Sequence, residues 1–287
     1  IPMVSDGRPM GYVGFGSVRK EKAWSDENIK LLKIAGEVLT NALRRKLAES
    51  EKAHLIKELE MKNTEMERFT YTVSHELRSP LITIQGFLEF LKKDIRQVDE
   101  MKIDTDIKMI ENAVNKMDAL LANTLELSRI GRAANPPEAV SYEEIVKDSL
   151  DQLAEKIRSS GISILVANEL PQVYVDRMRI TEVLVNLIEN SIKYMGDRTD
   201  PEVEIGCNAD TEKPVFFVRD NGMGIDPSQH EKVFELFYKL DKKSEGSGAG
   251  LAIVKRILEV HGGSVWIESE ERKGCKICFT LPLAEST

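Results

Sequence analysis

A histidine and a glutamate stand next to each other within a long helical pattern, in the segment Ser74–Pro80. On a helix that turns by about 100° per residue, His75 lies roughly 200° from the apolar position of Val73 and faces outward. A neutral imidazole is a nucleophile, and Glu76 can accept its ring proton and orient the other nitrogen. Pro80 cannot donate to the carbonyl of Glu76, so the helix can bend at the site. Because a lone exposed histidine is usually inert, the surrounding residues carry this prediction.

A second set of polar residues predicts one face of a later helix. Over a little more than two turns this face carries two amides, an ammonium and an aromatic ring: Asn186, Asn190, Lys193 and Tyr194. The opposite face is apolar, as a core helix requires. Amide oxygens beside a cation suit a metal–triphosphate group, because Mg²⁺ prefers hard oxygens and lysine supplies a point charge. Read alone, a plain surface helix explains this segment equally well.

Two glycine-containing loops complete the candidate chemistry. The apolar run from residue 215 ends at Asp220, which is followed by Gly222 and Gly224. A carboxylate there can accept a hydrogen bond from an exocyclic amine such as that of adenine, and glycines let the backbone approach a flat ring. The segment Gly246–Gly250 opens a helix, where free amides can hold a phosphate. Its spacing matches neither a dinucleotide fingerprint nor a Walker A loop.

The cysteines and the other histidines are interpreted as structural residues without a chemical role. Cys275 and Cys278 match a C-x-x-C pattern, but a spacing of three on a strand points them to opposite faces, which argues against metal or redox chemistry. The polar stretch 240–245 predicts a short lid or a solvated loop. The remaining histidines are interpreted as structural: His54, His230 and His261.

Composition narrows the possible functions. Of the 287 residues 41% are hydrophobic and the net charge is −8, so a real core is expected and nucleic-acid binding is disfavoured as the main function. Three cysteines do not build a disulfide scaffold. The sequence shows no membrane-spanning stretch and no signal peptide, its first residue resembles a cut inside something longer, and we expect a cytoplasmic location.

The elements that must position these residues fall into two classes. A hairpin near the N-terminus is followed by apolar residues at helical spacing from about 28 to 95 and again from about 103 to 131, which predicts a helical hairpin. Two helices with a kink near 50 are the alternative for the first stretch. Two hairpins from two chains would form a four-helix bundle. Beyond residue 138, short apolar runs alternate with amphipathic helices, which predicts a mixed sheet in an α+β sandwich.

These strings, in this order, resemble the sensor histidine kinases of two-component systems. They correspond to that family's five sequence boxes: Ser74–Pro80; Asn186, Asn190, Lys193 and Tyr194; Asp220, Gly222 and Gly224; Phe234 and Phe237; Gly246, Gly248 and Gly250. The resemblance covers residues 65–285. It implies a HisKA-type dimerisation and phosphotransfer domain at 65–135 and a Bergerat-type ATP-binding domain at 136–287. Residues 1–50 separately resemble, more weakly, the last strands and closing helix of a GAF-like sensor domain. This second resemblance implies a sensor-domain remnant at 1–24 and a signalling helix at 25–64.

Carried over, the resemblance implies that His75 takes a phosphoryl group from ATP and passes it to an aspartate of a response regulator. Glu76 and Ser79 would assist, Asn190 and Asn186 would hold Mg²⁺, and Asp220 would recognise adenine. The other implied nucleotide-binding residues are Lys193, Tyr194, Gly222, Gly224, Ile225, Phe237, Lys239, Gly246, Ser247, Gly248, Ala249, Gly250 and Leu251. The implied partners are a second copy, bound through the hairpin, and a receiver domain.

Three residues depart from the family's pattern. Ser79 replaces a threonine but keeps a hydroxyl, so dephosphorylation of the regulator is a second hypothesis. Lys239 replaces an arginine and loses bidentate phosphate geometry, and Ala249 replaces a larger residue. A third hypothesis, a plain ATPase or a DNA-processing relative, is disfavoured because an amide at Asn186 cannot act as the base that activates water.

Overall fold

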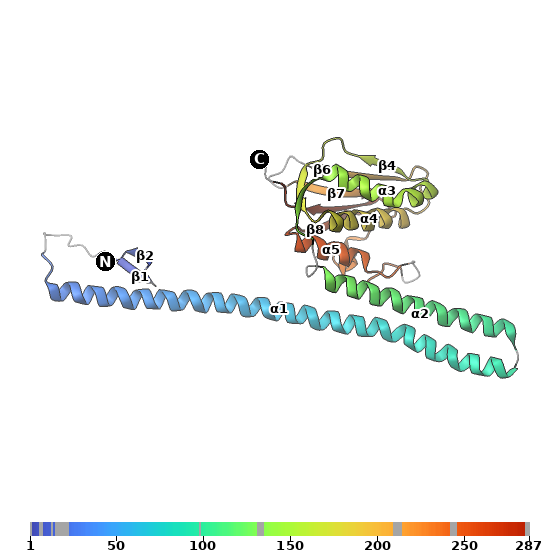
Figure 1. Ribbon diagram of the computed structural model, residues 1–287, viewed down its shortest axis with the longest axis horizontal. Coiled ribbons are helices and arrows are strands. Elements are labelled where there is room, and N and C mark those ends of the chain that lie inside the picture. The colour runs from blue at the N-terminus through green and yellow to red at the C-terminus, as the bar shows by residue number, and fades with distance from the viewer. Residues whose placement is uncertain are drawn as a thin grey trace. The chain divides into compact units, whose positions relative to one another are not determined.

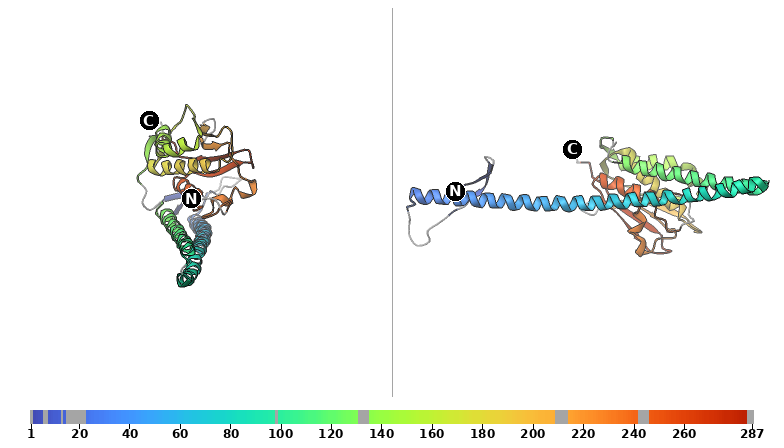
Figure 2. Two further views of the ribbon diagram at one scale, coloured as in Figure 1. Left: turned by 90° about the vertical axis from the view of Figure 1, so that its right-hand side faces the viewer. Right: turned by 90° about the horizontal axis from the view of Figure 1, so that it is seen from below.

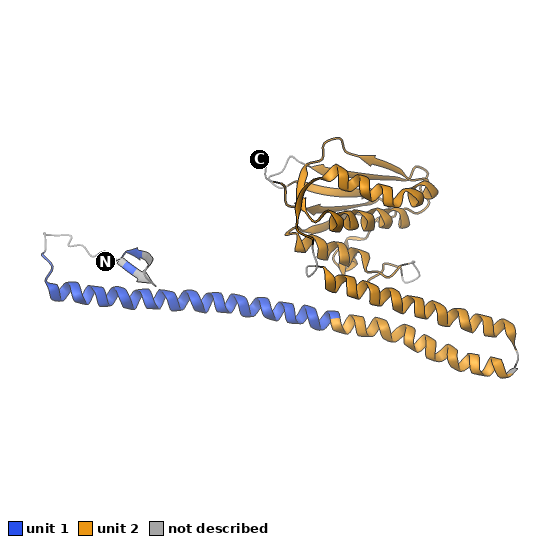
Figure 3. Cartoon of the chain, viewed as in Figure 1, with its two compact units in different colours: residues 1–69 blue, residues 70–287 orange. Residues whose placement is uncertain are grey.

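The computed structural model of the chain describes residues 2–5, 8–12, 14, 23–97, 99–130, 135–208, 214–241 and 246–284. Two compact units, Ile1–Phe69 and Thr70–Thr287, divide the chain, as Figure 3 shows. The boundary falls inside one long helix, α1 (Asp26–Gln97). Among the described residues, no helix is both long and apolar enough to cross a bilayer.

The first unit holds an antiparallel strand pair and the N-terminal part of α1. Strands β1 (Pro2–Ser5) and β2 (Arg8–Tyr12) form the pair. The predicted strand that runs on to residue 18 lies largely outside the described residues. Helix α1 is continuous, so the alternative of two helices with a kink near residue 50 is wrong.

The second unit contains a helical hairpin made of the rest of α1 and α2 (Glu100–Arg129), which runs back antiparallel to it (Figures 1 and 2). Helix α2 begins after Asp99, whose side chain accepts a hydrogen bond from the backbone N–H of Lys102 at 3.3 Å. Its buried positions are Asp106, Ala113 and Leu120. The antiparallel pair of helices confirms the predicted hairpin.

The rest of this unit is an α/β sandwich. A five-stranded sheet has the order β4-β6-β7-β9-β8, in which only β4 and β6 pair in parallel, and β3 pairs with β5 separately. The elements, in chain order, are β3 (Glu138–Ser141), α3 (Tyr142–Ser160), β4 (Ser163–Val166), β5 (Gln172–Val175), α4 (Arg177–Lys193), β6 (Glu202–Asn208), β7 (Val215–Asp220), the 3₁₀ turns η1 (Pro227–Gln229) and η2 (Lys232–Phe234), α5 (Gly250–Val260), β8 (Val265–Ser269) and β9 (Cys275–Thr280).

Helices α3, α4 and α5 cover one face of the five-stranded sheet (Figure 1). Phe216 and Phe279, on neighbouring strands β7 and β9, are fully buried beneath them. On the opposite face, Lys276 lies 5.0 Å from the centre of the Phe217 ring. Alternation along each strand therefore gives the sheet a buried face and a polar face. The predicted mixed sheet with helices is confirmed, whereas strand β3 was not predicted.

Candidate functional site

The histidine–glutamate pair lies on the exposed surface of α1. The imidazole of His75 is 64% exposed, and its Nδ1 lies 3.2 Å from Glu76 Oε1. The ring also stacks on Tyr71, with centroids 6.3 Å apart. When Nδ1 carries the proton it donates to Glu76, which leaves the Nε2 lone pair as the accessible nucleophile. The predicted outward orientation of His75 is thus observed.

The residues around this pair are arranged by the helix. Ser79 is exposed one turn after His75, and Pro80 is buried inside α1. Proline leaves the carbonyl of Glu76 without its helical hydrogen bond. The site therefore combines an exposed imidazole, a carboxylate and a hydroxyl on one stretch of helix.

Helix α4 positions the amide face. Asp176 caps its N-terminus by accepting from the backbone N–H of Arg179 at 3.3 Å. Ile180, Leu184 and Ile188 recur every four residues and have no exposed surface. Burial of this stripe against the sheet turns the opposite side of the helix, which carries the two asparagines, away from the core.

The two asparagines lie under the start of α5. The Asn186 side chain donates from Nδ2 to the carbonyl of Glu182 at 2.9 Å, so its Oδ1 faces the other way. A Cβ at Gly250 would come within 2.8 Å of that Oδ1 and 3.9 Å of Asn190 Nδ2. A side chain at residue 250 would displace the Asn186 amide, so glycine lets the start of α5 lie close to the amide face.

The cation of the amide face lies at the end of α4. Lys193 places its Nζ 4.7 Å from the centre of the ring of Tyr194, the residue that ends the helix. A Cβ at Gly246 would lie 3.4 Å from Lys193 Nζ. The loop before α5 therefore passes next to this ammonium.

Asp220 ends strand β7 and is extensively hydrogen-bonded. Its Oδ1 accepts from the backbone N–H groups of Gly222 at 2.9 Å and Cys275 at 3.2 Å. Its Oδ2 accepts from the Ser191 hydroxyl at 3.1 Å. Burial raises the pKa of this carboxyl, while the bond from Gly222 and the other hydrogen bonds lower it.

The loop after β7 is held to its surroundings through its backbone. The N–H of Ile225 donates to Ser269 Oγ at 2.8 Å, and Ile225 itself packs against the core. Gly224 has a φ of +71°. Arg198 donates from Nη2 to the carbonyls of Gly222 at 2.8 Å and Arg272 at 2.7 Å. The loop is thereby fixed beside Asp220.

The segment after η2 packs against the second glycine loop. Gly248 has a φ of +79°, and a Cβ there would lie 2.8 Å from the carbonyl carbon of Phe237 and from the carbonyl oxygen of Tyr238. Phe237 is half-buried against the core. Glycine is required at residue 248 both by its conformation and by this approach.

Lys239 lies between the sandwich and the helical hairpin. Burial lowers the pKa of its ammonium, as do the positive charges of Lys193 and Lys116, whereas Tyr194 and Glu76 act in the opposite direction. These interactions come from α4 as well as from both hairpin helices. Lys239 is therefore within electrostatic range of the neighbour of His75.

The start of α5 offers backbone donors. Ala249 is fully buried and donates its N–H to Ser247 Oγ at 3.3 Å. Leu251 is half-buried against the core. The first turn of α5 carries no acidic side chain, so its N-terminal dipole is not neutralised. This suits a phosphate group.

The assembled residues fit a nucleotide with a divalent cation. In the described part of the chain, no group of three or more histidine, cysteine or acidic side chains could hold a metal. The amide oxygens of Asn186 and Asn190, together with phosphate oxygens, form a donor set that the preference of Mg²⁺ for hard ligands allows. The half-buried carboxylate of Asp220 can accept a hydrogen bond from an exocyclic amine.

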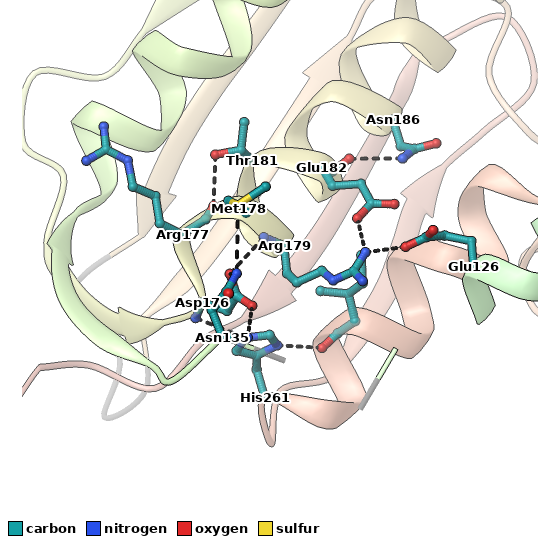
Figure 4. Close-up of polar contacts among 11 residues, drawn as sticks. Glu126, Asn135, Asp176, Arg177, Met178, Arg179, Thr181, Glu182, Asn186 and His261 are labelled. Carbon is teal, nitrogen blue, oxygen red and sulfur yellow. Dashed lines mark hydrogen bonds and ion pairs between the residues drawn. The ribbon is translucent and has the colours of Figure 1, made fainter. Parts of the chain in front are cut away.

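The N-terminal end of α4 carries a different cluster, shown in Figure 4. Arg179 forms ion pairs with Glu182 at 2.7 Å and with Glu126 of α2. Asn135 donates its backbone N–H to Asp176 at 3.0 Å. A cavity of about 710 Å³ lies here. None of the predicted nucleotide residues lines it, so this end of the helix attaches α4 to α2 and to the connection after it.

The side chains interpreted as structural behave so where they are described. His261 accepts at Nε2 from the N–H of Asp176 at 3.2 Å, and His230 Nε2 lies 3.2 Å from the carbonyl of Ile225. His54 is exposed on α1. Cys275 belongs to the core cluster beneath the helices and Cys278 does not. Burial raises the thiol pKa to about 12 for Cys275 and about 11 for Cys278, so neither is reactive.

Comparison with known proteins decides the family. Residues 65–133 match the His Kinase A (phospho-acceptor) domain. Residues 175–285 match the family described as histidine kinase-, DNA gyrase B-, and HSP90-like ATPase. The chain carries the two domains of a sensor histidine kinase. The predicted family and fold class are confirmed.

Individual relatives agree with this assignment. The methanogenesis regulatory histidine kinase FilI of Methanothrix harundinacea (strain 6Ac) is 53% identical over 98% of this chain and 33% of its own length. Sensor histidine kinase WalK of Bacillus subtilis (strain 168) is 32% identical over 80% of this chain and 39% of its own. The chain thus spans about a third of the length of the curated relatives that it matches.

Solved histidine kinases share the fold. The structure of ThkA in complex with response regulator protein TrrA gives a TM-score of 0.53 at 25% identity, and covers 76% of this chain and 61% of that chain. Full-length ShkA in complex with AMPPNP gives 0.52 at 26% identity, and covers 75% and 46%.

Proposed function

We propose that this chain transfers the γ-phosphoryl group of ATP to His75 and then to an aspartate of a response regulator. The observation that carries the proposal is the coexistence of an exposed histidine–glutamate pair with an amide face, a half-buried carboxylate and a glycine loop that meet around α4. The match to both histidine kinase domains supports it.

In this proposal the sandwich binds and orients the nucleotide. Asp220 accepts a hydrogen bond from the exocyclic amine of adenine. Gly222, Gly224 and Ile225 line the ring, and the backbone of Gly246–Leu251 donates to the phosphates. Lys193 and Lys239 add positive charge, and Tyr194 and Phe237 complete the wall of the site.

Asn190, with Asn186 beside it, would hold Mg²⁺ against the triphosphate. The ion, when bound, neutralises phosphate charge. An amide at Asn186 cannot take a proton from water, so the site favours transfer to a protein group over hydrolysis. This is the physical reason for preferring a kinase over a plain ATPase.

The hairpin supplies the nucleophile. Nε2 of His75 attacks the γ-phosphorus, a phosphorus–nitrogen bond forms, and the bond from phosphorus to the bridging oxygen breaks, with ADP as the leaving group. Glu76, 3.2 Å from Nδ1, stabilises the positive charge that develops on the ring. In the second step a carboxylate oxygen of the regulator's aspartate attacks the phosphorus, and Nε2 leaves.

Labelled ATP with Mg²⁺ tests the proposal. The chain should acquire an acid-labile, base-stable label, and His75→Gln should abolish it. His54→Gln, another exposed histidine on α1, is the matched control and should label normally. Label that survives in His75→Gln would contradict the assignment.

A second activity is favoured by the position of Ser79. Its hydroxyl is exposed one helical turn from His75, where it can orient a water for attack on the regulator's phosphoaspartate. Ser79→Ala should then lengthen the lifetime of a phosphorylated regulator without reducing self-labelling. An unchanged lifetime would remove this candidate.

We also propose that the hairpin pairs with a second copy and that residues 1–24 are the end of a GAF-like sensor domain. Exposed apolar residues on α1 and α2 support the first statement. The antiparallel β1–β2 pair is the observation behind the second. The domain boundaries at 24, 64 and 135 stay predictions.

A further inference from the structure

A buried serine lies behind the predicted adenine-binding carboxylate. Ser191 follows Asn190 on α4, but its side chain is turned about 100° away, toward strand β7. The residue is 5% exposed, and its hydroxyl donates to Asp220 Oδ2 at 3.1 Å. A buried hydroxyl on the core side of an amphipathic helix needs such a partner. The bond therefore joins α4 to the end of β7.

The acceptor sites of Asp220 are nearly all occupied. Each carboxylate oxygen offers about two lone-pair sites. Oδ1 accepts from the N–H groups of Gly222 and Cys275, so both of its sites are used. Oδ2 accepts only from Ser191 among the bonds of the described residues. One directed site on Oδ2 thus remains for a ligand.

We propose that the Ser191 hydroxyl is a positioning group that fixes the Asp220 carboxylate with one free acceptor site, and that it thereby selects an exocyclic amine over a carbonyl at the same place on a purine ring. The inference rests on the proposed function and deepens it. An amine donates to the free site, whereas a carbonyl such as that of guanine would place two acceptors face to face.

Selection of an amine depends on whether the Asp220 carboxyl is ionised, and the groups around it set its pKa. Burial raises the pKa of the carboxyl, and the hydroxyl of Ser191 and the guanidinium of Arg198 are among the groups that lower it. From β9, the Cys275 thiol faces it and is neutral, with a pKa of about 12. Without the hydroxyl the pKa rises further. A protonated carboxyl can donate to a guanine carbonyl, so selection should fade as pH falls.

Binding of non-hydrolysable ATP and GTP analogues to the full chain, by calorimetry across mildly acidic to neutral pH with Mg²⁺ present, tests the inference. Ser191→Ala should bind the ATP analogue about 10- to 100-fold more weakly near neutral pH, the loss expected for one hydrogen bond to a charged group. Its preference for adenine should also disappear at a higher pH than in the wild type. Ser191→Cys, which keeps a weak donor, should fall between the two.

Ser149→Ala is the matched control. Ser149 is fully buried on α3, and its hydroxyl donates to the carbonyl of Ile145 at 2.8 Å. Its loss should lower stability but leave the affinity ratio and its pH profile unchanged. A folded Ser191→Ala or Ser191→Cys protein with the wild-type ratio and profile would overturn the inference and leave the proposed function intact. A wild-type chain that binds neither analogue would overturn both.

Discussion

Apolar residues at helical spacing are buried on a helix of the sandwich but exposed on a helix of the hairpin. On α4, Ile180, Leu184 and Ile188 have no exposed surface. On α1, the equally regular positions Leu81 and Ile95 are 45% and 56% exposed, and Leu88 between them is 41% exposed. Both stripes have helical spacing, so periodicity alone does not distinguish them.

The difference shows which part of the molecule buries its apolar surface within a single chain. The sandwich buries its stripe against its own sheet. The hairpin leaves apolar surface exposed, and burial of a leucine stabilises by roughly 1.5–3 kcal/mol, so a second copy is the economical partner. The exposed surface of α1 also presents His75. In the proposed function the sandwich holds the nucleotide and the hairpin presents the phosphorylated histidine.

The largest effect should come from a substitution in the sandwich that prevents phosphorylation of the histidine on the hairpin. Asn190→Asp places a negative charge where the account puts Mg²⁺ and triphosphate, so self-labelling should fall by about a thousandfold or more, the scale of losing a main electrostatic contact in phosphoryl transfer. Circular dichroism should show an unchanged fold. Asn208→Asp, at the exposed end of β6, should label normally. Comparable loss in both variants would contradict the assigned role.

A charged residue in the exposed stripe of α1 should weaken dimerisation without changing nucleotide binding by the sandwich. Leu88→Asp should raise the dissociation constant of the dimer by about a hundredfold or more, because two copies lose apolar burial and two carboxylates would be desolvated. Analytical ultracentrifugation measures this. Lys93→Asp, an exposed position outside the stripe, should leave the dimer intact. Nucleotide affinity should be unchanged in both, and a dimeric Leu88→Asp protein would break the comparison.

The two faces of α4 could be predicted from the sequence because helical periodicity is a local property. Asn186 and Asn190 indeed lie opposite the stripe that contains Ile188. The role of Ser191 could not be predicted, because its partner Asp220 is 29 residues away in the chain. A polar residue on the predicted core side of the helix was the signal that could have identified it.

Strand β3 was missed for a different reason. Its four residues include one buried apolar side chain, Val140, and they follow Pro136 and Pro137, which indicate a linker. Pairing with β5 stabilises a strand too short to show its own alternation. The contact of Arg179 with Glu126 likewise depends on packing that no local pattern reveals.

The ionised carboxylate of Asp220 should lower the free energy of unfolding of the sandwich. The pKa of Asp220 is raised above its ordinary value by burial, so the folded state is penalised once the group ionises. Asp220→Asn should therefore raise the free energy of unfolding at neutral pH, while adenine binding weakens. The gain should be smallest below the ordinary aspartate pKa and should grow as pH rises through the raised value.

Urea unfolding of both proteins across that range measures the difference. A gain that shrinks as pH rises would contradict the direction of the shift. If Asp220→Asn were less stable than the wild type at every pH, the carboxylate would instead be a net stabiliser of the fold. The binding site would then impose no loss of stability on the sandwich.

The smallest effect should come from the ion pair between the two regions. Arg179 and Glu126 are 20% and 32% exposed, whereas the pair Arg45–Glu49 on α1 is 82% and 64% exposed. A double-mutant cycle with Glu126→Gln and Arg179→Gln should give a coupling energy of about 1 kcal/mol, and a cycle on the exposed pair should give a value near zero. Equal couplings would show that α2 and α4 are not specifically joined.

The central claim is that a nucleotide held by the sandwich phosphorylates a histidine displayed by the hairpin. Mass spectrometry of the full chain after incubation with Mg²⁺ and ATP, under conditions that preserve phosphorus–nitrogen bonds, tests it most directly. The account predicts one phosphoryl group per chain, on Nε2 of His75. A phosphoryl group on any other residue, or ATP consumed with no phosphorylated chain, would contradict it.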